Sequence, residues 1–170
     1  MTFYVRKLNK AKWCIDPSGG SLPANADAIT NCLKTSRNTL SFWLVDSMDH
    51  VDEAVLAIVA SNDNLDSIDI VVVPESYLIE KGIEIQATAG HTACSDLVNA
   101  HRDLANLNVK HLDVLSEYIV NQLQSRAVKR YTLSKLREIL TIAVDNGRIA
   151  PDQLSEGVRK KIFPVDSTAA

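Results

Sequence analysis

The sequence predicts an α/β fold, in which a small sheet with a βαβ unit in the N-terminal half packs on an all-helical C-terminal half. Two apolar runs, 40–45 and 68–73, enclose a segment whose apolar residues repeat at helical spacing. After Gly90 the spacing of apolar residues is helical throughout. Two strands joined by a helix of this length are expected to run parallel, with a right-handed crossover.

The chain length limits the domain organisation. Its 170 residues suffice for one domain or two small lobes. We expect an α/β lobe at 1–90 and a helical lobe at 91–163 that shares the same core, because neither lobe is large enough alone. Residues 164–170 are small or polar and predict a flexible tail.

Short elements are expected before the βαβ unit. Residues 3–8 and 12–15 predict two strands, and a hairpin around 9–10 is expected although the turn lacks glycine. The glycine, serine and proline residues of 17–23 predict a break in regular structure. Residues 24–33 then suit a short helix.

The helix of the βαβ unit begins in an acidic stretch. Asp49 is the expected N-cap, and Asp52 and Glu53 fall in the first turn, where carboxylates oppose the positive end of the helix dipole. After the second strand, 77–79 either extend the sheet or form one helical turn. Apolar residues alternate with polar ones over 83–87, which predicts a third strand with one buried face.

Helical spacing dominates the rest of the chain. Helices are expected at 92–106 and 109–124, and a third begins at its N-cap Thr132. Gly147 stands where a left-handed C-terminal cap is expected. Pro151 opens a last short helix.

Composition is typical of a globular protein, with 46% hydrophobic and 23% charged residues. The net charge of −3 favours neither presence nor absence of nucleic acid, but the charges are unevenly distributed. Residues 39–100 hold eleven acidic side chains and one basic, while 1–38 and 101–170 are both net basic. Either the ends complement the acidic middle, or opposite surfaces serve docking.

We expect a cytoplasmic protein without a membrane span. The first ten residues are too charged for a signal peptide, and no apolar run approaches the roughly 20 residues of a span. The cysteines, Cys14, Cys32 and Cys94, are odd in number and far apart, which suits a reducing compartment.

Acidic residues and one histidine follow the first strand of the βαβ unit. Ligands bind at the carboxyl ends of parallel strands, so Asp46 and Asp49 are candidates to hold Mg²⁺, with His50 as an acid or base. This interpretation gives a Mg-dependent nuclease or hydrolase. Helix capping and a solvated loop explain the same residues and are favoured, because no second carboxylate cluster accompanies them.

Other chemical motifs are not found. His91 and Cys94 form one pair with zinc-like spacing, but a zinc site needs four ligands. The glycines match neither nucleotide-binding pattern. We therefore expect no enzymatic activity, no metal and no cofactor.

A basic segment lies between two expected helices. Within twelve residues that contain no acid stand Arg126, Lys129, Arg130, Lys135 and Arg137. With two helices and a turn, this segment could make a helix-turn-helix-like DNA contact, as in a DNA-binding regulator. An ordinary basic face that docks on an acidic partner, or on the acidic middle of the chain, is the favoured interpretation.

Four stretches together carry a resemblance to a known family. They are TLSFWLVDS (39–47), EAVLAIVASNDNLDSIDIVVVPESYL (53–78), GHTACSDLVNAHRDLANL (90–107) and YTLSKLREIL (131–140). Their pattern resembles the small middle component of bacterial three-component defence systems built around an SMC-like ATPase, the Lamassu type among them. Phe42–Trp43 and His101–Leu104 are its most distinctive pieces.

The resemblance implies a non-catalytic adaptor subunit. It would bridge an SMC-like ATPase and an effector nuclease in an anti-phage or anti-plasmid complex, with DNA reached through the complex. No catalytic motif is carried over. Interfaces favour aromatic and arginine anchors, so the expected contacts are the five cations of the basic segment and Trp13, whereas Trp43 on an apolar strand is expected in the core.

Overall fold

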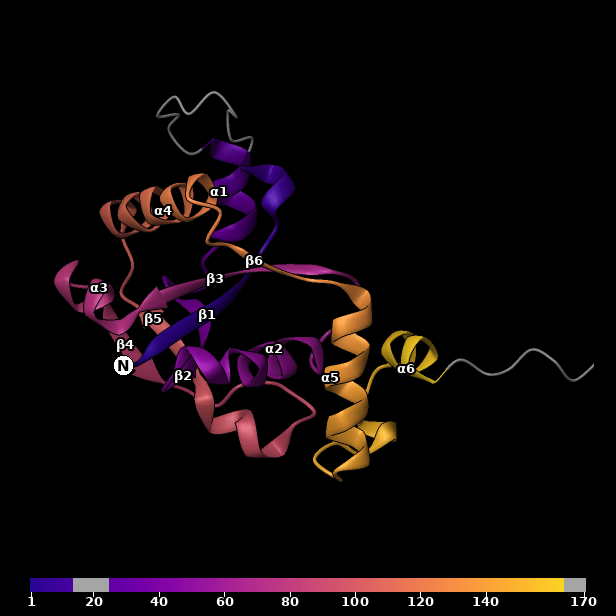
Figure 1. Cartoon of the computed structure of the whole chain (residues 1–170). Coiled ribbons are helices and arrows are strands. Elements are labelled where there is room, and N and C mark those ends of the chain that lie inside the picture. The colour runs from indigo at the N-terminus through magenta and orange to yellow at the C-terminus, as the bar shows by residue number, and fades with distance from the viewer. Residues whose placement is uncertain (14–24, 164–170) are drawn as a thin grey trace, which may run out of the picture.

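A computed structural model describes residues 1–13 and 25–163 of the chain (Figure 1). Cys14, the expected break at 17–23 and the expected tail at 164–170 lie outside the described residues. The predicted α/β class is confirmed, since an antiparallel sheet of six strands carries helices on its two faces.

The sheet has the strand order β4-β5-β2-β1-β3-β6. Its members are β1 (Phe3–Leu8), β2 (Leu40–Val45), β3 (Ile68–Pro74), β4 (Glu84–Ala87), β5 (His101–Ala105) and β6 (Lys129–Tyr131). Strands β2 and β3 are each antiparallel to β1, so they run in the same direction, as the βαβ prediction requires. They are not neighbours, however, because β1 lies between them.

Helices follow the predicted order with some changes. The α-helices are α1 (Ala26–Cys32), α2 (Val51–Val59), α3 (Glu75–Glu80), α4 (Val109–Gln124), α5 (Leu133–Asp145) and α6 (Glu156–Ile162). Short 3-10 helices are η1 (Lys10–Lys12), η2 (Met48–His50), η3 (Ser95–Ala100) and η4 (Pro151–Gln153). The predicted 109–124 helix has the bounds of α4. Residues 77–79 belong to α3, so of the two predicted alternatives after β3 the helical turn is the one observed.

Two predicted elements are wrong. The described part of 12–15 is not a strand, because the chain turns into η1 after β1 and the Trp13 N–H donates to the Lys10 carbonyl. The 92–106 helix is replaced by η3 and β5. Its apolar spacing fits a helix, but pairing of β5 with β2 places Leu104 opposite Leu40 in the core. With β5 and β6, the half after Gly90 is therefore not all helical.

The helix caps are partly as predicted. Thr132 caps α5 by accepting from the Lys135 N–H, and Gly147 has a φ of 72°, the left-handed conformation expected after that helix. Asp49 is not the N-cap of α2. Instead the Ser47 hydroxyl accepts from the Asp49 N–H and begins η2, which precedes α2. The extra 3-10 turn shifts the helix start by one residue, so that His50 is the N-cap of α2.

Side chains of the sheet alternate between two hydrophobic clusters, one on each face. Val5 faces a cluster formed with α2, α5, α6 and η3, whereas Tyr4 faces one formed with α1, α3 and α4. Figure 1 shows α1 and α4 on one side of the sheet and α2 on the other. The result is three layers, with the sheet in the middle.

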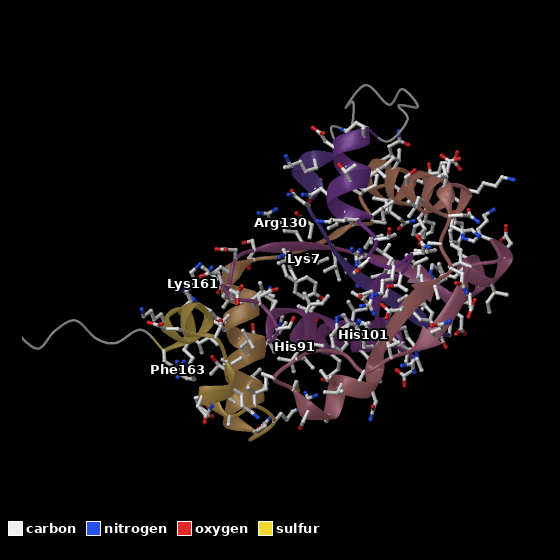
Figure 2. The ribbon with its side chains drawn as sticks, turned by 180° about the vertical axis from the view of Figure 1, so that it is seen from behind. Lys7, His91, His101, Arg130, Lys161 and Phe163 are labelled. Atoms are coloured by element: carbon white, nitrogen blue, oxygen red, sulfur yellow. The ribbon has the colours of Figure 1, made fainter. Side chains whose placement is uncertain are left out.

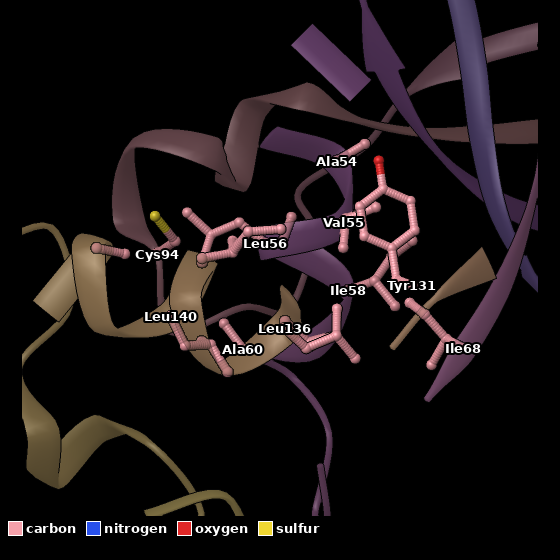
Figure 3. Packing of buried hydrophobic residues seen from close by; sticks show 14 of the residues in the cluster. Ala54, Val55, Leu56, Ile58, Ala60, Ile68, Cys94, Tyr131, Leu136 and Leu140 are labelled. Atoms are coloured by element: carbon pink, nitrogen blue, oxygen red, sulfur yellow. The ribbon is translucent and has the colours of Figure 1, made fainter. Parts of the chain in front are cut away.

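Helix α2 is the most enclosed element. Seven of its nine residues are buried, because the sheet covers one side and α5 and η3 cover the other. Figure 3 shows Leu136 and Leu140 of α5 packed beside the α2 side chains Leu56 and Ile58. A helix that is apolar on most sides is expected in such a buried position.

Candidate functional site

The acidic segment at the end of β2 is only partly brought together. The His50 Nδ1 atom lies 2.5 Å from Asp46 Oδ1, and both side chains are exposed. The hydrogen bond from Asp46 raises the pKa of His50, and the same bond lowers the pKa of Asp46. Asp49 instead accepts a hydrogen bond from the Ser47 hydroxyl. A pocket of about 410 Å³ beside the pair is lined by Leu44, Val45, Asp46, His50 and Glu53.

The next two carboxylates stabilise the fold. The Tyr131 hydroxyl donates to Asp52 Oδ1 at 2.6 Å, and burial together with this bond raises the pKa of Tyr131. Arg148 donates to both oxygens of Glu53, at 3.1 and 2.5 Å, and also to Asp96. The bond to Glu53 raises the pKa of Arg148. These contacts fasten α2 to β6, η3 and the turn after α5.

Within 1–13 and 25–163, no group of three or more His, Cys, Asp or Glu side chains is arranged to hold a metal ion. What the acidic segment offers chemically is the Asp46–His50 pair. A carboxylate that raises the pKa of a histidine favours the protonated ring, which can act as a general acid near neutral pH.

The two described cysteines are buried. The Cys94 thiol donates to Asp96 Oδ1 at 2.9 Å, and burial raises its pKa to about 12, so the reactive thiolate is disfavoured. His91 is exposed and lines a separate pocket beside Gln153. Cys32 accepts the indole N–H of Trp13 at 3.3 Å. Both thiols therefore act as core residues.

Trp13 and Trp43 are both core residues. Trp13 is 3% exposed, which corrects the expectation that it anchors a partner. Trp43 is buried as predicted, and its ring contacts His101 edge-on with centroids 5.1 Å apart. Tryptophan is enriched both in cores and at interfaces, so the sequence alone does not separate the two cases.

The five cations of the basic segment, which we call the basic surface, lie on the edge strand β6, in the turn before it and on helix α5 after it. Arg130 pairs with Asp69 of β3 at 3.2 Å, and Lys135 pairs with Glu138 at 3.0 Å. The remaining three, Arg126, Lys129 and Arg137, are exposed and have no ion pair with a described residue. Figure 2 labels Arg130 on β6 and Lys7 on β1, the two strands that flank β3.

Strand β6 gives the basic surface its shape. It pairs with β3 on one side, and within the described chain no strand pairs with its other side. Lys129 stands on this strand, Arg126 in the turn before it, and Arg137 on α5 after it. The cations thus lie on an edge strand, in the turn before it and on the helix after it, whereas a helix-turn-helix contact would place them along one recognition helix.

Two arginines connect distant parts of the fold, and neither was singled out from the sequence. Arg148 holds the Glu53 and Asp96 carboxylates, and Arg6 reaches between β1 and β2. Arg6 had a signal in the sequence, because it occupies a core-facing position of the alternating strand FYVRKL. Arg148 had none, since its partners lie far away along the chain.

Comparison of the chain with protein-family models, curated proteins and solved structures finds no match. The resemblance of residues 39–140 to a defence-system subunit therefore stays a prediction. Among the residues that the structure describes, none of the helices has the length and apolar character needed to cross a membrane.

Proposed function

We propose that this chain is a non-catalytic adaptor subunit whose basic surface docks an acidic segment of a partner protein. The proposal is carried by one observation, the three exposed cations that form no ion pair with a described residue and that stand on the edge strand β6 or next to it along the chain. Lys129 stands on the edge itself, with Arg126 and Arg137 on either side along the chain.

The sheet edge and the charges support the same mode of binding. An edge strand exposes N–H and C=O groups that an extended segment can pair with, which is the mode called β-augmentation. Cations beside that edge attract a segment rich in Asp or Glu and disfavour a basic one. An acidic, extended partner segment is the ligand that fits both features.

The resemblance supplies the proposed partners. They are an SMC-like ATPase and an effector nuclease of a cytoplasmic bacterial anti-phage or anti-plasmid complex, which this subunit bridges. DNA is reached through the complex rather than by this chain alone. A bridging role requires a second contact surface in addition to the basic surface.

A tagged chain purified from its native host at moderate salt tests the proposal, with mass spectrometry as the readout. We expect recovery of a large coiled-coil ATPase, with or without a nuclease. The double variant Lys129→Glu and Arg137→Glu should reduce that recovery at least about tenfold, because opposite charges then become like charges. The matched control is Lys110→Glu, an exposed residue in the first turn of α4. Recovery of the tagged chain as a monomer without a partner would contradict the adaptor proposal.

A Mg-dependent hydrolase is the second candidate, supported by the pocket beside the Asp46–His50 pair. It requires that Asp46→Asn together with Asp49→Asn abolishes hydrolysis of nucleic acid while the thermal melt stays near that of the unmodified chain. Salt-dependent binding of duplex DNA, lost when Lys129, Arg130 and Arg137 become Ala, would instead indicate the DNA-binding regulator.

A further inference from the structure

Strands β1 and β2 separate after a short paired stretch. Only Phe3–Val5 pair with Trp43–Val45, although β1 continues to Leu8 and β2 begins at Leu40. The Arg6 side chain enters the opening. Its Nη1 atom donates to the Ser41 carbonyl at 2.6 Å, and its Nε atom donates to the Cys32 carbonyl at 3.0 Å. A guanidinium therefore stands where ladder hydrogen bonds would otherwise continue.

A pocket of about 420 Å³ lies at this opening. Its polar lining includes Arg6, Lys7, Asn9 and Asn31, and its apolar lining includes Trp43 and Ile58. The volume falls within the range of roughly 300–1,000 Å³ that is typical of small-molecule sites. Such sites combine apolar walls with a few convergent polar groups, as this pocket does.

No described carboxylate forms a direct ion pair with the two cations of the pocket, Arg6 and Lys7. Burial lowers the pKa of Arg6 to about 10. Arginine has five N–H groups, and the two hydrogen bonds to backbone carbonyls leave three without an acceptor in the described chain.

We propose that this pocket binds a phosphorylated small molecule, with the phosphate on Arg6 and Lys7 and an apolar or aromatic part against Trp43 and Ile58. Phosphate matches the forked donors of a guanidinium, and a charged hydrogen bond is stronger than a neutral one. The amide groups of Asn9 and Asn31 add donors of the kind that phosphate oxygens accept.

Isothermal titration of the full-length chain with adenosine 5′-monophosphate and, separately, with inorganic phosphate tests this site. Saturable binding of the monophosphate, tighter than that of phosphate, is the expected result. Lys7→Ala removes one phosphate donor, and Asn31→Asp puts a carboxylate of the same shape at the pocket wall. Each should weaken binding about tenfold, the loss of one charged contact, whereas Lys110→Ala on α4 should leave it unchanged.

The variants avoid Arg6 because its two carbonyl bonds hold the strands, so its removal risks unfolding. Circular dichroism melts of Lys7→Ala and Asn31→Asp, both exposed positions, show whether the fold is kept. Absence of saturable binding, or affinities that both folded variants leave unchanged, would overturn the site. Equal affinity for phosphate and the monophosphate would overturn the role of Trp43 and Ile58. The outcome is independent of the adaptor proposal, which concerns β6.

Discussion

Asp46 and His50, four residues apart, form an exposed pair in which each side chain stabilises the charged form of the other. The hydrogen bond raises the pKa of His50 and lowers that of Asp46. A histidine whose pKa is raised by folding stabilises the fold below its unfolded pKa, and that contribution is lost as pH rises through the folded pKa. In NMR titrations we expect His50 to titrate above the usual value near 6.5 and Asp46→Asn to bring it back toward that value.

The control for this titration is His101, which lies outside the Asp46–His50 pair and whose pKa is lowered by burial. Its titration curve should be the same with and without Asp46→Asn. A His50 curve that the substitution leaves in place would show that the pair does not form in solution. It would then no longer follow that His50 can act as a general acid in the pocket beside the pair.

Single residues differ in how far their sequence context predicts them. Thr132 and Gly147 were predicted as caps because capping depends on neighbouring backbone groups. Trp43 was predicted in the core because it stands in an apolar strand. Trp13 was placed wrongly, because its burial depends on Cys32, far along the chain. A local sequence pattern therefore predicts a role that depends on neighbouring residues, but not one that depends on a partner far along the chain.

At the scale of elements, α6 is fastened to the loop between α2 and β3. The Ser155 hydroxyl donates to the carbonyls of Asn62 and Asp63, and Lys161 donates to the Leu65 carbonyl. Gly157 makes this approach possible. A Cβ atom at that position would lie 2.4 Å from the Asp63 carbonyl oxygen and 2.4 Å from Asn64 Oδ1.

Gly157→Ala is therefore expected to destabilise the protein, although alanine is intrinsically better in a helix by about 1 kcal/mol. The backbone carbonyl of Asp63 cannot move aside like a flexible side chain, so α6 must shift from the loop. We expect a net loss of about 1–3 kcal/mol in the free energy of unfolding, typical of overpacking, measured by urea denaturation. Arg159→Ala, an exposed change on the same helix, should be nearly neutral. A stabilising Gly157→Ala would contradict the close packing.

The type of an element was predicted correctly where the spacing of its apolar residues fits only one kind of secondary structure. The α4 stripe is long, and its bounds were found. Residues 92–106 also carry apolar side chains at helical spacing, but the stretch splits into η3 and β5 because β2 offers a free edge for pairing. Similarly, the βαβ unit was found, but not the insertion of β1 between its strands. Sheet order depends on partners that a local pattern does not contain.

At the scale of the whole molecule, ion pairs connect the acidic middle to the basic C-terminal part. Arg130 contacts Asp69, Arg148 contacts Glu53 and Asp96, and Lys161 contacts Asp66 at 2.8 Å. Internal compensation thus accounts for part of the uneven charge distribution. The cations left over, on the basic surface and in the pocket at Arg6, are the ones that the two proposals use.

This arrangement predicts a loss of stability in acid. The Lys161 hydrogen bond lowers the pKa of Asp66, and hydrogen bonds from Cys94 and then Arg148 lower that of Asp96. Carboxylates with a lowered folded pKa stabilise the protein above their unfolded pKa, near 3.9, and that contribution disappears as pH falls through the folded pKa. The urea midpoint should therefore drop as pH falls below about 4. Lys161→Met should lower the midpoint at pH 7 and make its fall in acid shallower, because Asp66 then regains an ordinary pKa. The same acid slope in this variant would mean that the pair contributes nothing to stability.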